Sequence, residues 1–201
     1  NGAGIAEAAA SDILTINNEC LWFIVKVPDV GVSAPRGWPP DIPGVQEKGI
    51  AVLTADQGRT IEILRRLVAF PSVSGSDNTD IVSYIAGLLE DAGIFTRIVE
   101  TSEGQLNLWA RLGPDAAGGI ALSGHVDVVP VTDQDWSTDP WTLTPAQGRL
   151  YGRGTCDMKG FVACCIASLT AAAAAGLEMA RPVYLVLSCD EEIGSYSVPK
   201  V

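Results

Sequence analysis

Hydrophobic residues recur at helical spacing in three segments of the chain. An apolar residue every three or four positions is typical of a helix with one buried face. The first predicted helix begins near Thr54 and stops before Phe70, the second ends at Gly93, and the third covers residues 158–175. The predicted buried faces are Ile61, Leu64 and Val68 in the first helix, Ile81, Ile85, Leu88 and Ala92 in the second, and Phe161, Cys165 and Leu169 in the third.

Five short runs bounded by turn-forming residues predict strands. They cover residues 94–99, 107–112, 118–123, 149–151 and 182–188. The last run is apolar throughout, which is typical of a strand buried on both faces of a parallel sheet. Because strands alternate with amphipathic helices, the predicted class is α/β, with a layered sheet and flanking helices.

Residues 1–50 have a different pattern. An alanine-rich start at residues 6–10 leads into a stretch interrupted by many prolines and glycines. We predict a poorly ordered N-terminal extension with one short helix near its start, followed by a folded part at residues 51–201. The first residue is asparagine rather than methionine, which suggests a fragment or a misplaced start.

Acidic side chains and one histidine follow three of the predicted strands, at the point where each strand ends. Ligand sites in open α/β sheets lie outside the carboxyl ends of the strands, so we expect these side chains to converge on one metal site. The candidate residues are His125 and Asp127 after strand 118–123, Asp157 after strand 149–151, and Asp190, Glu191 and Glu192 after strand 182–188.

Each candidate also has an ordinary structural interpretation. A lone histidine near a strand end is more often simply hydrogen-bonded, but Asp127 points to the same side of an extended segment and can orient the imidazole. Asp157 precedes a predicted helix, so it can cap that helix as well as bridge two cations. The three consecutive acids form either a solvated loop or a site where one carboxylate binds a metal and its neighbour takes a proton from water.

The charge balance argues against several partners. Lys and Arg total 13 against 24 Asp and Glu, for a net charge of -11, which disfavours nucleic acid and anionic membrane surfaces. No apolar run approaches the roughly 20 residues that span a bilayer, and the start lacks the basic region of a signal peptide. The five cysteines are odd in number and form no CxxC pair, so we expect a cytoplasmic protein in a reducing compartment.

Other catalytic patterns fit the sequence less well. It contains no P-loop, no HExxH and no GxSxG segment. Cys156 and Cys189 lie beside candidate ligands, so a cysteine paired with His125 as nucleophile is an alternative. The neighbouring carboxylates disfavour a thiolate, which makes this pair the weaker interpretation.

Three segments resemble, in the same order, the signatures of the M20 family of dinuclear zinc amidohydrolases and peptidases. They are SGHVDVVP at 123–130, GRGTCDMKG at 152–160 and DEEIG at 190–194. The resemblance runs from about residue 60 to the C-terminus and does not cover residues 1–50. The segments DWSTDPW at 135–141 and GTCDMKGF at 154–161 look most like the acetylornithine deacetylase branch. Ser197 stands where a small residue, often glycine, is expected, and we assign it no function.

The resemblance implies a role for each candidate residue. His125 binds one zinc ion, Glu192 binds the other and Asp157 bridges them, with cobalt or manganese as alternative metals. Asp127 orients His125, and Glu191 is the general base that takes a proton from water and passes it to the leaving amine. The implied reaction is hydrolysis of an N-acyl amino acid, with N-acetylornithine, converted to ornithine and acetate in arginine biosynthesis, as the favoured substrate.

The ligand count is lower than a complete two-zinc site requires. Two roughly tetrahedral ions need about eight positions, and His125, Glu192, a bridging Asp157 and a bridging water provide about six. The family implies a further acidic residue and a late histidine, whereas His125 is the only histidine here. We therefore expect an N-terminal portion of the catalytic domain, without the lid or dimerisation domain, that binds metal weakly and is inactive by itself. The complete protein is expected to be a homodimer.

Two alternatives to this function are open. One is another M20 activity, namely succinyl-diaminopimelate desuccinylase, aminoacylase or carboxypeptidase. The other is a non-catalytic binding module that keeps the fold. The presence of both Asp127 and Glu191 argues against the module, because a protein without catalysis need not keep both.

Overall fold

The computed structural model describes residues 57–146 and 149–198 in full, together with the backbone of four short strands nearer the N-terminus. The chain divides into two compact units, residues 1–54 and residues 55–201. In the first unit β1 (Ile16–Asn17) pairs with β2 (Cys20–Leu21), and β3 (Phe23–Lys26) pairs with β4 (Ile50–Leu53), both antiparallel. The short helix predicted near the start lies outside the described residues, as does most of the predicted extension.

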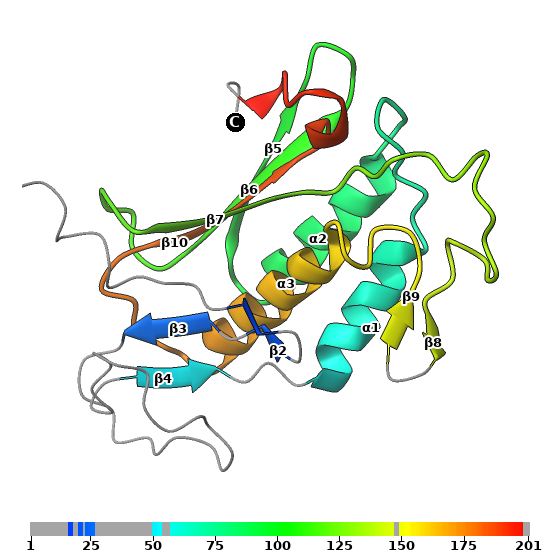
Figure 1. Cartoon of the computed structure of the whole chain (residues 1–201). Helices are drawn as coiled ribbons and strands as arrows, with labels where there is room; N and C mark the ends of the chain where they lie inside the picture. Colours follow the sequence, from blue (N-terminus) through cyan, green and yellow to red (C-terminus); the bar gives the residue numbers. More distant parts are fainter. Residues whose placement is uncertain are drawn as a thin grey trace, which may run out of the picture. The chain divides into compact units, whose positions relative to one another are not determined.

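A four-stranded mixed sheet forms the centre of the second unit (Figure 1). Its order is β5 (Phe95–Glu100), β6 (Leu106–Leu112), β10 (Val183–Ser188) and β7 (Ile120–His125). β6 is antiparallel to both β5 and β10, whereas β10 and β7 are parallel. The predicted α/β class, with a sheet and flanking helices, is confirmed.

Three helices lie on one side of this sheet (Figure 1). They are α1 (Gln57–Val68), α2 (Thr79–Asp91) and α3 (Lys159–Ala174). α2 contacts β5 and β6, while α3 contacts β7 and both other helices. Because α3 has neighbours on several sides, its buried residues are distributed around the helix rather than along one face. None of the helices among the described residues has the length and apolar character to cross a bilayer.

The predicted buried faces of the first two helices are partly wrong. In α1, Leu64 and Val68 are buried as predicted, but Ile61 is 36% exposed and Ile63 and Leu67 are buried in its place. In α2, the predicted Ile81 and Ile85 are buried, whereas Leu88 and Ala92 are only partly so. Ile61 and Leu88 lie at the edge of the apolar face of their helices, so the spacing alone places the buried face only approximately.

The predicted helix ends at Gly93 and Gly176 are confirmed. The N–H of Ile94 donates to the carbonyl of Leu89 at 3.0 Å, and the N–H of Leu177 donates to the carbonyl of Ala172 at 3.2 Å. These bonds reach back over the glycine and satisfy carbonyl groups that the last turn of each helix leaves without a partner.

The prediction that residues 149–151 form a strand is confirmed, but this strand does not belong to the main sheet. β9 (Arg149–Tyr151) pairs with β8 (Thr144–Ala146) in a separate two-stranded ribbon. The expectation that all three strands end at one edge of one sheet is therefore wrong for the strand at residues 149–151. A three-residue run carries no information about which strand will become its partner.

Candidate metal centre

The parallel pairing of β7 and β10 brings the histidine and the acidic triplet to the same edge of the sheet. His125 is the last residue of β7 and is paired with Ser188, the last residue of β10. The chain then continues from β10 through Asp190 into a short 3-10 turn at Glu191–Ile193. The two strand ends thus present an imidazole and two carboxylates from segments more than 60 residues apart in the sequence.

Asp157 reaches this edge through the glycine-rich turn that precedes α3. The N–H of Lys159 donates to the carbonyl of Gly154 at 2.7 Å and closes the turn. Gly154 has a φ of +82°, and a Cβ there would lie 2.9 Å from a methyl group of Val128. Only glycine fits this backbone conformation and this close approach without strain. The peptide bond between Asp157 and Met158 is cis.

Asp157 does not cap α3, so that part of its ordinary interpretation is wrong. The residue at the N-cap position is Met158, and no side-chain hydrogen bond caps the helix. The carboxylate of Asp157 is instead 72% exposed, with Oδ1 at 3.0 Å from Nε2 of His125. The turn directs this side chain toward the strand ends rather than back onto its own helix.

Three potential ligands from three segments meet at this edge. The ligand atoms of His125, Asp157 and Glu192 all lie within 4.8 Å of one another. A tetrahedral zinc ion with ligand distances of about 2.0–2.2 Å requires atoms separated by about 3–4 Å, so small side-chain adjustments suffice. One nitrogen and two carboxylates form a donor set that suits zinc and other first-row divalent ions. The residues present therefore fit a metal ion.

The hydrogen bonds of His125 leave its outer nitrogen available. Nδ1 lies 2.9 Å from the main-chain carbonyl of Asp127, which can only accept, so Nδ1 carries a proton. The carboxylate of Asp127 is farther away, at 3.4 Å. Burial lowers the pKa of His125, but hydrogen bonds and charge from Asp127, with a further hydrogen bond from Asp157, outweigh it and raise the pKa to about 9. A metal ion at Nε2 would replace the second proton.

The carboxylate of Asp127 joins the two halves of the centre. It is buried and accepts hydrogen bonds from the N–H of Glu191 at 3.1 Å, the N–H of Glu192 at 3.2 Å and the hydroxyl of Ser74 at 2.7 Å. Burial raises the pKa of Asp127, but these hydrogen bonds and that to His125 hold it below its usual value. Asp127 thus contacts the main chain of the acidic turn as well as the imidazole, which the sequence did not indicate.

The two glutamates of the turn differ in their surroundings. Glu191 is half-exposed, with Oε2 at 3.7 Å from Nε2 of His125. The pKa of Glu192 is raised, first by burial and then by the negative charge of Asp157. A cation between Glu192 and Asp157 would remove this repulsion, whereas Glu191 is not one of the three clustered ligands.

Several residues near the centre were missed or assigned no role from the sequence. Ser74 lies in the polar turn between α1 and α2, and the buried Asn107 lies on β6. Ser197, which was assigned no function from its sequence position, is also buried and contacts Asn107 as well as Asp190. Each acts through contacts with distant residues, which local spacing does not reveal.

The alternative nucleophile Cys189 is disfavoured by its position. Its thiol is buried and lies near the hydroxyl of Ser197 and the amide oxygen of Gln105. Burial raises the pKa of the Cys189 thiol, which keeps it protonated and a poor nucleophile.

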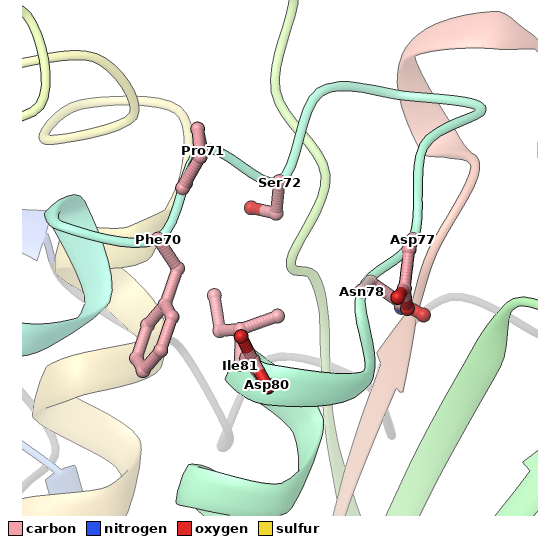
Figure 2. Close-up of a pocket in the computed structure, with 7 residues that line it drawn as sticks. All are labelled: Phe70, Pro71, Ser72, Asp77, Asn78, Asp80 and Ile81. Atoms are coloured by element: carbon pink, nitrogen blue, oxygen red, sulfur yellow. The ribbon is translucent and has the colours of Figure 1, made fainter.

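A separate small pocket lies beside the loop between α1 and α2 (Figure 2). Its volume of about 120 Å³ is below the 300–1,000 Å³ typical of sites for small-molecule ligands. None of the three clustered ligands lines it. The lining residues are Phe70, Pro71, Ser72, Asp77, Asn78, Asp80 and Ile81.

Lys159 fixes the beginning of α3 from inside the protein. Its side chain is completely buried, and Nζ donates a 2.7 Å hydrogen bond to the carbonyl of Phe70, just beyond the end of α1. Nζ also lies 5.7 Å from the centre of the Trp141 ring. Burial lowers the pKa of Lys159 to about 7.

Replacing Lys159 with methionine should remove a pH dependence of stability. An unfolded lysine keeps its proton up to about pH 10.4, whereas folded Lys159 loses it above about pH 7. Between these values the unfolded state binds more protons, so stability rises with pH. In urea titrations from pH 7 to 9, the free energy of unfolding of the wild type should rise relative to Lys159→Met by roughly 1 kcal/mol per pH unit. Parallel curves would contradict this assignment.

A family model and several known proteins match this chain. Residues 121–201 match the model of peptidase family M20/M25/M40. The acetylornithine deacetylase of Proteus mirabilis (strain HI4320) is 39% identical over 140 residues, which are 66% of this chain and 35% of that protein. Human carnosine dipeptidase 1 is 28% identical with a TM-score of 0.61, over 72% of this chain and 34% of that one.

A more distant structure shows the same fold. An M20 family metallo-carboxypeptidase from Sulfolobus solfataricus is 23% identical with a TM-score of 0.59, over 70% of this chain and 32% of that one. The chain spans about a third of the length of these relatives.

Proposed function

Because the chain belongs to peptidase family M20/M25/M40, we propose that it is part of a zinc-dependent hydrolase that cleaves the amide bond of an N-acyl amino acid. The favoured substrate is N-acetylornithine, which yields ornithine and acetate in arginine biosynthesis. The observation that carries the proposal is the cluster of His125, Asp157 and Glu192. The identity of 39% to the Proteus mirabilis acetylornithine deacetylase supports the choice of substrate.

In this proposal His125, Asp157 and Glu192 hold the metal. Nε2 of His125 faces the cluster while Nδ1 donates to a main-chain carbonyl, an arrangement that fixes the ring for metal binding. Asp157 has two carboxylate oxygens and is mostly exposed, so it is the residue suited to bridge two ions. Zinc, when bound, supplies a Lewis acid for the scissile carbonyl.

Glu191 is the proposed general base. It lies beside the cluster, with Oε2 at 3.7 Å from Nε2 of His125, and is exposed enough to meet water and substrate. In the proposed reaction its carboxylate takes a proton from water, and the same proton then passes to the leaving amine. Asp127 is a positioning residue in this scheme, because its carboxylate binds the N–H groups of both glutamates.

The described residues supply three clustered ligands, which is fewer than two zinc ions require. We propose that residues 51–201 are the N-terminal portion of the catalytic domain. The matched part of this chain covers only about a third of the length of the relatives, and the remaining ligands and the lid or dimerisation domain of a homodimer would come from other parts of the protein. The isolated 201 residues should then bind metal weakly and show no useful turnover.

A substrate panel on the complete zinc-loaded protein tests the proposed reaction. N-acetylornithine, N-succinyl-diaminopimelate, other N-acyl amino acids and dipeptides would be compared by kcat/KM. We expect N-acetylornithine to exceed every other substrate by at least about tenfold, since a pocket that hydrogen-bonds a polar side chain rejects analogues that lack it.

Dipeptide hydrolysis is the second candidate, because the identity of 28% to human carnosine dipeptidase 1 favours it. If a dipeptide were the best substrate, dipeptide hydrolysis would take the place of the proposed deacetylation. Failure to hydrolyse any substrate, despite bound zinc, would favour a binding module.

A further inference from the structure

The turn that carries Glu191 and Glu192 belongs to a loop that is closed by Asp190. The main-chain carbonyl of Asp190 accepts a hydrogen bond from the N–H of Ser195 at 2.8 Å. Its carboxylate accepts the N–H of Ser197 at 2.8 Å and the hydroxyl of Ser197 at 2.6 Å. Asp190 and Ser197 are both buried. Asp190 is not one of the three clustered ligands, and its hydrogen bonds tie together the two ends of the loop.

Asn107 anchors both ends of this loop to the sheet. Its Oδ1 accepts the N–H of Cys189 at 3.0 Å, and its Nδ2 donates to the carbonyl of Ser197 at 3.5 Å. Asn107 is completely buried on β6. The start and the end of the loop thus meet at one residue of a central strand.

The hydroxyl of Ser197 stands between these two groups. It lies 2.6 Å from Oδ1 of Asp190 and 3.2 Å from Oδ1 of Asn107. A hydroxyl has one proton, and the shorter bond to a charged carboxylate is the stronger one. Without this hydroxyl, Oδ1 of the buried Asp190 would lose its closest hydrogen-bond donor. A buried acceptor left without a partner lowers the free energy of unfolding.

We propose that Ser197 is a positioning residue for the carboxylates of Glu191 and Glu192, acting through Asp190. The middle of the loop is held by the N–H bonds to Asp127, and Asp190 fixes its ends. The inference deepens the proposed function, because these two carboxylates are the proposed metal ligand and general base. It also gives a role to the hydroxyl of Ser197. A glycine, which is often expected at this position, has no hydroxyl and could not form these hydrogen bonds.

The test compares Ser197→Ala, Ser197→Thr and Ser168→Ala in the 201-residue chain. Ser168 lies on α3 and is buried to nearly the same extent, 6% against 5% exposed, so its replacement is a matched loss of a buried hydroxyl. Hydrogen exchange of the Glu191 and Glu192 amides should accelerate about tenfold in Ser197→Ala, with the amides of β10 unchanged. The affinity for zinc should fall about tenfold. Ser197→Thr, which keeps the hydroxyl, should restore both.

Three outcomes would overturn the proposal. They are exchange at Glu191 and Glu192 within twofold of the wild type, equal acceleration throughout β10 and α3, and an equal effect of Ser168→Ala. The exchange measurement needs no metal. If the complete protein bound no zinc while Ser197→Ala still accelerated exchange only in the turn, the proposed metal site would fail and the positioning role of Ser197 would stand.

Discussion

Replacing His125 with alanine should reduce the affinity of the chain for zinc by at least about a hundredfold. The imidazole is the one nitrogen ligand of the cluster, and Nε2 lies 3.0 Å from the Asp157 carboxylate. Loss of a residue that only orients a ligand already costs 10–100-fold in metal affinity, so loss of the ligand itself should cost more. Calorimetric titration with zinc at a fixed pH, which can follow the weak binding expected of this chain, measures this difference.

Asp80→Asn is the matched control for His125→Ala. It removes one of the two carboxylates, Asp77 and Asp80, that line the separate small pocket beside the loop between α1 and α2 (Figure 2). We expect its zinc affinity to equal that of the wild type. If Asp80→Asn weakened zinc binding and His125→Ala did not, the metal would bind at that pocket and the assignment of the centre would be wrong.

Replacing Glu191 with glutamine should lower kcat of the complete protein by about 10²–10⁴-fold, the range expected for a general base. Glutamine keeps the size of the side chain but cannot take a proton. Because Glu191 is outside the ligand cluster, its replacement should leave the affinity for zinc within about threefold of the wild type. Steady-state kinetics on N-acetylornithine and a zinc titration of the same preparation measure the two quantities.

Glu192→Gln is the informative comparison for Glu191→Gln. The two glutamates are adjacent and both N–H groups bind Asp127, so general damage to the turn should affect both variants alike. Glu192→Gln should instead show a clear loss of affinity for zinc, because Glu192 is one of the three clustered ligands. A Glu191→Gln enzyme that keeps more than a tenth of its kcat, or that loses zinc as Glu192→Gln does, would contradict the separate roles of the two residues.

The sequence predicted the elements well because each depends on local spacing and local stop signals. The ends at Gly93 and Gly176 follow from backbone hydrogen bonds that span only five residues. The meeting of His125 with the acidic turn could also be predicted, since parallel strands end at the same edge of a sheet.

The errors arise where long-range contacts decide the structure. The strand at residues 149–151 pairs with its neighbour in the sequence instead of the main sheet, and Asp157 points to the strand ends instead of capping α3. The exposure of Ile61 and burial of Ile63 depend on how α1 packs against α3. In each case several partners satisfy the same local pattern, and packing selects one of them.

Residues that support the centre were the hardest to predict. Ser197 contacts Asn107 across 90 positions, and Ser74 contacts Asp127 across 53. Serine and asparagine occur throughout polar turns for ordinary reasons, so their type and spacing carry no signal for such contacts. Only the fold shows that both act on the turn bearing Glu191 and Glu192.

An anomalous-difference map at the zinc absorption edge, from crystals of the zinc-soaked chain, tests the central claim most directly. The predicted result is a peak bonded to Nε2 of His125 and to carboxylate oxygens of Asp157 and Glu192, at distances of about 2.0–2.2 Å. The peak should disappear in His125→Ala crystals soaked in the same way. Zinc bound elsewhere on the chain, with no peak among these three residues, would contradict the account.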